Sequence, residues 1–166
     1  MEKLILIAGP CVVESEEITL HIAREVVRLS AEYDMDLIFK ASYRKANRSS
    51  ASSYTGIGDR EALEILAEIR ERFGMPVLTD VHEASEVELA ASYVDVLQIP
   101  AFLCRQTDLI TAAARTGRIV NLKKGQFLSP AEMGQVIDKA RRGGATRILV
   151  TERGTTFGYN NLVADM

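Results

Sequence analysis

Six short apolar stretches, separated by segments with helical periodicity, constrain the fold of this chain more than any other feature. The stretches carry few polar residues, which is typical of strands buried on both faces of a parallel sheet. The segments between them place apolar residues three or four positions apart, as the buried side of a helix requires. Strands that alternate with helices indicate an α/β fold. The predicted strands cover residues 4–8, 36–40, 76–79, 94–99, 119–123 and 147–151.

Capping signals locate the starts of three of the five predicted helices. Ser15 is expected to cap the first helix and Asp59 the second. Ser129 and Glu132 form a capping box around Pro130, which suits the first helical position and predicts a helix start there. The first helix is expected to bury one apolar stripe, formed by Ile18, Ile22, Val26, Leu29 and Tyr33.

Polar residues collect immediately after the predicted strands, and this pattern narrows the architecture. A (β/α)8 TIM barrel and a doubly wound open sheet both place their sites at the carboxyl ends of parallel strands. No G-x-G-x-x-G sequence follows the first strand, which argues against the dinucleotide-binding open sheet. We therefore expect a (β/α)8 TIM barrel, with residues 1–166 as a single domain.

The number of predicted elements is smaller than a closed barrel requires. A complete (β/α)8 barrel has eight strands and about 250 residues, whereas this chain has 166 residues and only about six strands and five helices. We interpret residues 1–166 as the N-terminal part of a barrel whose C-terminal part is absent from this sequence. A partial barrel that closes by association is the alternative.

A dense group of hydrogen-bond donors follows the second predicted strand. Lys40 and Ser42 fall on one face, because side chains alternate along a strand. The next donors are Arg44, Lys45, Asn47, Arg48, Ser49 and Ser50, and residues 40–50 contain no carboxylate. Cations and hydroxyls at the end of a strand suit a phosphate or carboxylate ligand. A solvated polar loop is the alternative.

The overall composition makes this group of donors a local feature. The net charge of −3 gives no general attraction for nucleic acid or for an anionic membrane. No apolar run approaches the roughly 18 residues of a transmembrane helix. Two cysteines are too few for a disulfide framework, and the first residues do not resemble an export signal. We therefore expect a cytoplasmic protein without nucleic-acid or membrane partners.

Five stretches resemble, in order, the site loops of the 3-deoxy-D-manno-octulosonate 8-phosphate synthase family. Lys45-Ala-Asn-Arg-Ser-Ser50 is similar to its sugar-phosphate loop, where the related heptulosonate synthases carry a Lys-Pro-Arg-Thr-Ser type of sequence. The resemblance extends over essentially the whole chain. The other four stretches are residues 9–15, 98–108, 121–127 and 152–161.

This resemblance implies a transferase that condenses phosphoenolpyruvate with arabinose 5-phosphate and water. The products would be 3-deoxy-D-manno-octulosonate 8-phosphate and phosphate, within lipopolysaccharide biosynthesis, and the enzyme would be a homotetramer. One alternative is a 3-deoxy-D-arabino-heptulosonate 7-phosphate synthase, which uses erythrose 4-phosphate. The other is an inactive, truncated barrel that retains anion-binding sites.

Position-by-position transfer of the family's residues gives candidate site residues. Those implied for phosphoenolpyruvate are Lys40, Ser42, Lys45, Gln98, Lys123 and Arg153. Those implied for the sugar phosphate are Asn47, Arg48, Ser49 and Arg105, with Arg105 reaching it from a neighbouring subunit, and Phe102 is implied in substrate binding. Lys45, Asn47 and Asp80 are implied in catalysis, with Asp80 near either the sugar hydroxyls or the metal. Without the resemblance, the sequence hardly distinguishes Lys123 from Lys124 as a ligand.

The resemblance also implies a divalent metal, Zn, Fe, Mn or Co, bound by Cys11. Metal-dependent members carry cysteine at this position, whereas the others carry asparagine. One thiolate is not a complete site, and the family's His, Glu and Asp ligands would lie beyond the last residue of this sequence. From the residues alone, a small buried thiol is the better interpretation of Cys11. The same interpretation holds for Cys104.

Overall fold

The computed structural model describes residues 3–48, 50, 52–156, 158 and 162–164. The chain divides into two compact units. The first unit comprises the chain up to Asp80 together with Tyr93–Asp95, and the second comprises Val81–Ser92 and the chain from Val96 onward. Whether residues 1–166 act as a single domain stays a prediction.

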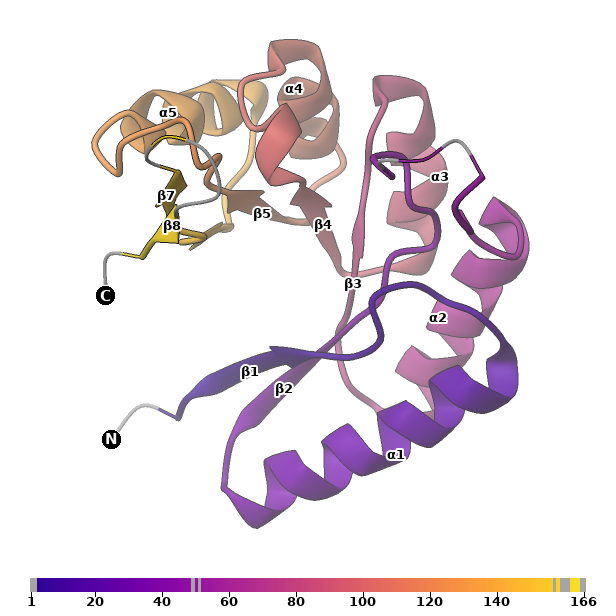
Figure 1. Ribbon diagram of the computed structural model, residues 1–166. Helices are drawn as coiled ribbons and strands as arrows, with labels where there is room; N and C mark the ends of the chain where they lie inside the picture. Colours follow the sequence, from indigo (N-terminus) through magenta and orange to yellow (C-terminus); the bar gives the residue numbers. More distant parts are fainter. Residues whose placement is uncertain (1–2, 49, 51, 157, 159–161, 165–166) are drawn as a thin grey trace. The chain divides into compact units, whose positions relative to one another are not determined.

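The first unit is a parallel, three-stranded βα arrangement in chain order (Figure 1). Residues of β1 pair with residues of β2 from Ile5↔Asp36 to Ala8↔Phe39, and β2 pairs with β3 through Lys40↔Leu78. Helix α1 packs against β2 and α2, and α2 packs against β3. The elements are β1 (Ile5–Ala8), α1 (Glu16–Glu32), β2 (Asp36–Lys40), α2 (Asp59–Phe73) and β3 (Val77–Asp80).

The second unit repeats this pattern with three further parallel strands in chain order. Helix α4 packs against α5 and against both β4 and β5. A short antiparallel pair, β7 and β8, follows the last parallel strand. The elements are η1 (Ala84–Glu86), α3 (Val87–Tyr93), β4 (Val96–Ile99), η2 (Ala101–Leu103), α4 (Thr107–Arg115), β5 (Ile119–Lys123), α5 (Met133–Gly143), β6 (Ile148–Thr151), β7 (Thr155–Thr156) and β8 (Leu162–Val163).

The predicted fold class is confirmed. Six parallel strands and five α-helices are present among the described residues, in the order that the first part of a (β/α)8 barrel requires. The strands β3 and β4 are fully buried, as expected for strands covered on both faces. Within the described part of the chain, no helix is long and apolar enough to cross a lipid bilayer.

Helix α1 begins where the sequence predicts, but it buries a different face. The Ser15 hydroxyl accepts a hydrogen bond from the Ile18 amide at 3.3 Å, so the predicted cap is confirmed. The predicted apolar stripe is wrong, because Ile18 and Tyr33 are 48% and 64% exposed. The buried residues of the helix are Thr19, Leu20, Ala23 and Ser30.

Two other predicted helix starts are shifted along the chain. Gly58, not Asp59, is the N-cap of α2, and Asp59 is instead an acidic residue of the first helical turn. The capping box forms: the Ser129 amide donates to the Glu132 carboxylate at 2.7 Å, and the Glu132 amide donates to the Ser129 hydroxyl at 3.3 Å. The α-helix proper begins only at Met133, because the intervening amides bond to carbonyls three residues back.

Gly9 is required where the loop after β1 passes the end of β2. Its φ is 155°, and a Cβ at this position would lie 2.2 Å from the Lys40 carbonyl oxygen. Because backbone atoms cannot rotate away, Gly9→Ala should lower the free energy of unfolding by roughly 1–3 kcal/mol in a urea titration. The control is Gly58→Ala, which has a φ of 126° but nothing within 4 Å of the added Cβ. Equal losses in both variants would contradict the close-contact explanation.

Candidate active site

Strand pairing in the first unit brings Ser42 and Asp80 to the same level of the sheet. Lys40 pairs with Leu78, so Asp80 at the end of β3 and Ser42, two residues past the end of β2, lie at one level and share the face of Lys40. The Ser42 carbonyl accepts from the Val13 amide at 3.0 Å, which fixes the chain just beyond β2. The sequence therefore positions one cation, one hydroxyl and one carboxylate through regular strand geometry.

Ser42 is the centre of a hydrogen-bonded cluster formed with Lys40, Lys45 and Asp80. Its hydroxyl accepts from the ammonium of Lys40 at 3.1 Å and from that of Lys45 at 2.9 Å. The same hydroxyl donates to Asp80 Oδ2 at 2.5 Å. The two ammonium nitrogens lie 3.7 Å and 3.9 Å from this carboxylate oxygen. We call these four residues the Ser42 cluster.

The Ser42 cluster carries an excess positive charge in a largely buried place. Two ammonium groups face one carboxylate, while the side chains of Lys40, Lys45 and Asp80 are only 20%, 13% and 10% exposed. An ammonium has three donors, and the contacts of Lys45 with Ser42 and Asp80 leave it donor capacity for an anion. Burial strengthens such contacts relative to water. The cluster is therefore suited to bind a phosphate or carboxylate.

Two of the predicted sugar-phosphate residues, Asn47 and Arg48, lie in the loop that follows the Ser42 cluster. Asn47 and Arg48 are exposed, and Arg48 Nε donates to the Tyr54 carbonyl at 3.3 Å. Ser49, also predicted for this site, lies outside the described residues. The arrangement leaves Asn47 and Arg48 accessible to a ligand.

In the second unit, polar side chains form a chain across three neighbouring strands. Asn121 Nδ2 donates to Gln98 Oε1 at 2.8 Å, and Thr151 Oγ1 donates to Asn121 Oδ1 at 3.0 Å. Gln98 and Asn121 are 5% and 1% exposed. Of the three, the sequence interpretation selected only Gln98. A single amide inside the apolar β5 was a usable signal for Asn121, because buried amides need partners.

Lys123 and Lys124 have different environments. Lys124 is 1% exposed, and its ammonium donates to the carbonyls of Leu128 and Gly154 at 3.0 and 2.8 Å. It also lies 3.3 Å from the Gly125 carbonyl, so it ties the loop after β5 to the loop after β6. Lys123 is half-buried, and its ammonium shows no such contact within the described part of the chain. The geometry therefore makes Lys124 structural and leaves Lys123 available for a ligand.

Arg153 follows a carboxylate that is held by the turn after β6. Burial raises the pKa of Glu152, but hydrogen bonds from the amides of Gly154 and Arg153, followed by the Lys124 charge, outweigh it and leave that pKa lowered. Glu152 therefore stays ionised and accepts from those amides at 2.5 and 2.9 Å. The Arg153 side chain is exposed at this turn. The backbone at Arg153 is thus fixed while its guanidinium remains accessible.

The loop after β4 presents both predicted residues to solvent. Phe102 is 44% exposed and Arg105 is exposed, while the Arg105 carbonyl accepts from Lys139 Nζ at 3.0 Å. Cys104, between them, is fully buried, so its predicted role as a small apolar residue agrees with the structure. The backbone of this loop is therefore anchored on α5, with two large side chains directed outward.

Cys11 is exposed, which contradicts the interpretation as a buried thiol. Among the described residues, no group of three or more His, Cys, Asp or Glu side chains could hold a metal ion. The residues described here therefore do not make a metal site by themselves, whatever Cys11 contributes.

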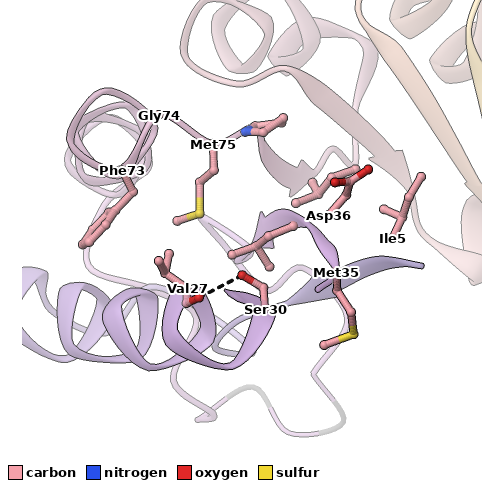
Figure 2. A pocket seen from close by; sticks show the side chains of 11 residues that line it. Ile5, Val27, Ser30, Met35, Asp36, Phe73, Gly74 and Met75 are labelled. Atoms are coloured by element: carbon pink, nitrogen blue, oxygen red, sulfur yellow. Dashed lines mark hydrogen bonds between the residues drawn. The ribbon is translucent and has the colours of Figure 1, made fainter. Parts of the chain in front are cut away.

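A cavity of about 480 Å³ lies in the first unit at the amino-terminal ends of the strands (Figure 2). Ile5 and Asp36 begin β1 and β2, and Met75 precedes β3. Its lining is mainly apolar and contains one carboxylate but no cation. This cavity is at the other end of the strands from the Ser42 cluster, and it does not suit an anionic substrate.

Comparison with known proteins gives consistent matches along the chain. A family model described as "DAHP synthetase I family" matches residues 1–166.

Three of the curated relatives that match this chain are named 2-dehydro-3-deoxyphosphooctonate aldolase. The protein of Syntrophotalea carbinolica is 55% identical over 161 residues, covering 97% of this chain and 58% of the relative. That of Trichlorobacter lovleyi is 55% identical over 163 residues, covering 98% and 60%, and that of Azoarcus sp. is 56% identical over 167 residues, covering 99% and 60%. The chain thus spans about three fifths of the length of the curated relatives it matches.

Proposed function

Because the chain belongs to the DAHP synthetase I family, we propose that the full-length protein joins phosphoenolpyruvate to arabinose 5-phosphate. With water, the products are 3-deoxy-D-manno-octulosonate 8-phosphate and phosphate. The relatives' names refer to a phosphorylated 2-keto-3-deoxy octonate, which favours this reaction over the heptulosonate alternative. The proposal places the enzyme in the cytoplasm, where its product supplies lipopolysaccharide biosynthesis.

The Ser42 cluster is the observation that carries the proposal. Phosphoenolpyruvate has a phosphate and a carboxylate on one small skeleton, so it needs several cations close together. Lys40 and Lys45 converge on one hydroxyl beside Asp80, and this arrangement has an excess of one positive charge. Structural ion pairs more often balance their charges, whereas an excess of buried cations favours an anionic ligand.

Each candidate residue has a proposed role. Lys40, Ser42, Lys45, Gln98, Lys123 and Arg153 bind phosphoenolpyruvate, with Arg153 suited to a bidentate grip on its phosphate. Asn47, Arg48, Ser49 and Arg105 bind the sugar phosphate, and Phe102 contributes to substrate binding. Lys45, Asn47 and Asp80 act on the reacting groups: Lys45 and Asn47 orient them, and Asp80 faces the sugar hydroxyls.

The proposed reaction is an aldol-like condensation. Carbon 3 of phosphoenolpyruvate attacks the aldehyde carbon of the sugar, and the aldehyde oxygen takes up a proton. Positive charge develops at carbon 2, water adds there and loses a proton, and phosphate leaves by cleavage of the C–O bond. No side-chain nucleophile is needed, so the protein's contribution is to hold two anionic substrates in reacting geometry.

Arg105 provides a test of the sugar-phosphate contact that we expect between subunits of the proposed homotetramer. If its guanidinium reaches arabinose 5-phosphate bound in a neighbouring subunit, Arg105→Ala should raise the KM for that sugar about ten- to a hundredfold. The KM for phosphoenolpyruvate should change much less, because the lost contact is to the sugar phosphate alone. Steady-state kinetics with each substrate varied in turn measures both values. Equal increases for the two substrates would contradict the assignment.

Cys11 is proposed as one ligand of a divalent metal in the full-length protein. The support is its exposed thiol in the stretch that resembles the family's first loop. A thiolate suits Zn²⁺ or Fe²⁺, and Mn²⁺ or Co²⁺ are alternatives. The described residues supply no complete ligand set, so Cys11 would be one ligand among others from outside them. Full turnover by demonstrably metal-free protein would contradict this proposal.

Phosphate release from phosphoenolpyruvate is the assay that tests the proposed function. The full-length protein should release phosphate only when a sugar phosphate is also present, because carbon 2 becomes electrophilic only after carbon 3 has attacked. Release without any sugar would indicate a phosphatase. Release with erythrose 4-phosphate but not with arabinose 5-phosphate would indicate the heptulosonate reaction.

A further inference from the structure

The loop that carries Asn47 and Arg48 is closed at its base by backbone contacts. The Lys45 amide donates to the Thr55 carbonyl at 2.8 Å. Gly56 lies so close to the segment after β2 that an added Cβ would be 2.9 Å from the Tyr43 carbonyl oxygen. Both ends of the loop therefore converge between residues 43–45 and 55–56, immediately before α2.

Arg44 and Asp59 add an ion pair outside this base. Arg44 Nη1 lies 3.2 Å from Asp59 Oδ2, with the two side chains 34% and 37% exposed. The guanidinium carbon lies 5.8 Å from the centre of the Tyr43 ring, and Tyr43 is 1% exposed. Arg44 thus connects a buried aromatic residue to the first turn of α2. From sequence, Arg44 was one more donor for an anion, but its charge contacts Asp59.

We propose that the Arg44–Asp59 pair is a latch that positions the sugar-phosphate loop. The inference rests on the proposed function, because it concerns how Asn47 and Arg48 are presented to arabinose 5-phosphate. A loop held in its binding conformation loses less conformational entropy when the ligand arrives. Arg44 and Asp59 are therefore positioning residues, and neither contacts the substrate.

Replacing Asp59 distinguishes a latch from a simple electrostatic effect, because the two predict opposite changes in the KM for arabinose 5-phosphate. Asp59→Asn removes a negative charge near an anion-binding loop, so electrostatics alone would lower the KM for both substrates. Loss of the latch should instead raise the KM for arabinose 5-phosphate about two- to fivefold, the range for a partly exposed ion pair. The KM for phosphoenolpyruvate and the kcat should stay close to their wild-type values.

Glu61→Gln is the matched control. Glu61 is exposed in the same first turn of α2, so this variant removes an equal charge and an equal interaction with the helix dipole. It should leave the KM for the sugar phosphate unchanged or slightly lower. The double variant Arg44→Asp with Asp59→Arg exchanges the two charges and keeps the ion pair. Its KM for arabinose 5-phosphate should return most of the way to the wild-type value.

Limited trypsin digestion gives a readout that does not depend on turnover. Cleavage at the exposed Arg48 should be several times faster in Asp59→Asn than in wild type and in Glu61→Gln, because an unlatched loop opens more often. Equal cleavage rates and equal sugar KM values in Asp59→Asn and Glu61→Gln would overturn the latch. If trypsin cleaves the wild-type protein only slowly at Arg48, but the protein never turns over arabinose 5-phosphate, the proposed function is wrong. The positioning role of the ion pair is then wrong as well.

Discussion

Lys45→Met should lower kcat/KM for phosphoenolpyruvate by about 10²- to 10³-fold, the range for losing one preorganised donor to a reacting anion. Lys45 is 13% exposed and shares the Ser42 hydroxyl with Lys40. Its removal leaves one ammonium beside Asp80, so the excess positive charge of the Ser42 cluster disappears. Methionine keeps the length and apolar volume of the lysine stem, which limits packing effects. Initial rates at varied phosphoenolpyruvate concentration measure the loss.

Lys3→Met is the control for this prediction. Lys3 is in the same unit but before β1, in an exposed ion pair with Asp34. Lys3→Met removes one positive charge near the amino-terminal end of β1, whereas the Ser42 cluster lies at the carboxyl ends of the strands. The kcat/KM for phosphoenolpyruvate should therefore change little. Circular dichroism should confirm that both variants fold. A folded Lys45→Met protein with a kcat/KM within threefold of wild type would refute the role of the cluster.

Lys124→Met should cost about 3 kcal/mol of unfolding free energy, because it leaves buried backbone carbonyls without a donor. Each unsatisfied carbonyl costs roughly 1 kcal/mol or more, and the ammonium of Lys124 serves Gly125, Leu128 and Gly154. Glu152, 3.4 Å away and partly exposed, adds little. The measurement is the urea midpoint and slope of the full-length protein.

The neighbouring lysine provides the matched comparison for this stability prediction. Lys123→Met is the same chemical change one residue earlier, at a half-buried side chain that is available for a ligand. It should cost less than about 1 kcal/mol in stability but should strongly reduce turnover, because it removes a proposed phosphoenolpyruvate contact. Similar stability losses in the two variants would contradict the division of roles between Lys123 and Lys124.

The strands could be predicted from the sequence because each is a short, mainly apolar run that ends at a polar residue, glycine or proline. The buried face of α1 could not, and the reason lies in its polar residues. Thr19 and Ser30 are buried because their hydroxyls donate to carbonyls of the helix segment itself, Ser15 at 2.6 Å and Val27 at 2.9 Å. The spacing of apolar residues cannot show that a hydroxyl is hydrogen-bonded and can be buried. It therefore assigned the exposed Ile18 and Tyr33 to the buried face of the helix.

Site geometry was predictable only where strand alternation controls it. Lys40 and Ser42 on one face follow from the two-residue period of a strand, and Lys45 could join them only through the fold of the loop. Arg44 and Lys45 are equivalent in composition, yet one pairs with Asp59 and the other with Ser42. The structural role of Lys124 depends on contacts with the loop after β6, which no local pattern encodes.

The most direct test of the proposed function is a competition between two sugars. The full-length protein is incubated with phosphoenolpyruvate and equal concentrations of arabinose 5-phosphate and erythrose 4-phosphate, and the products are identified by mass spectrometry. The proposal predicts mainly the eight-carbon keto acid phosphate, with one phosphate released for each product molecule. A predominance of the seven-carbon product, or no product from a folded protein that still binds phosphoenolpyruvate, would contradict it.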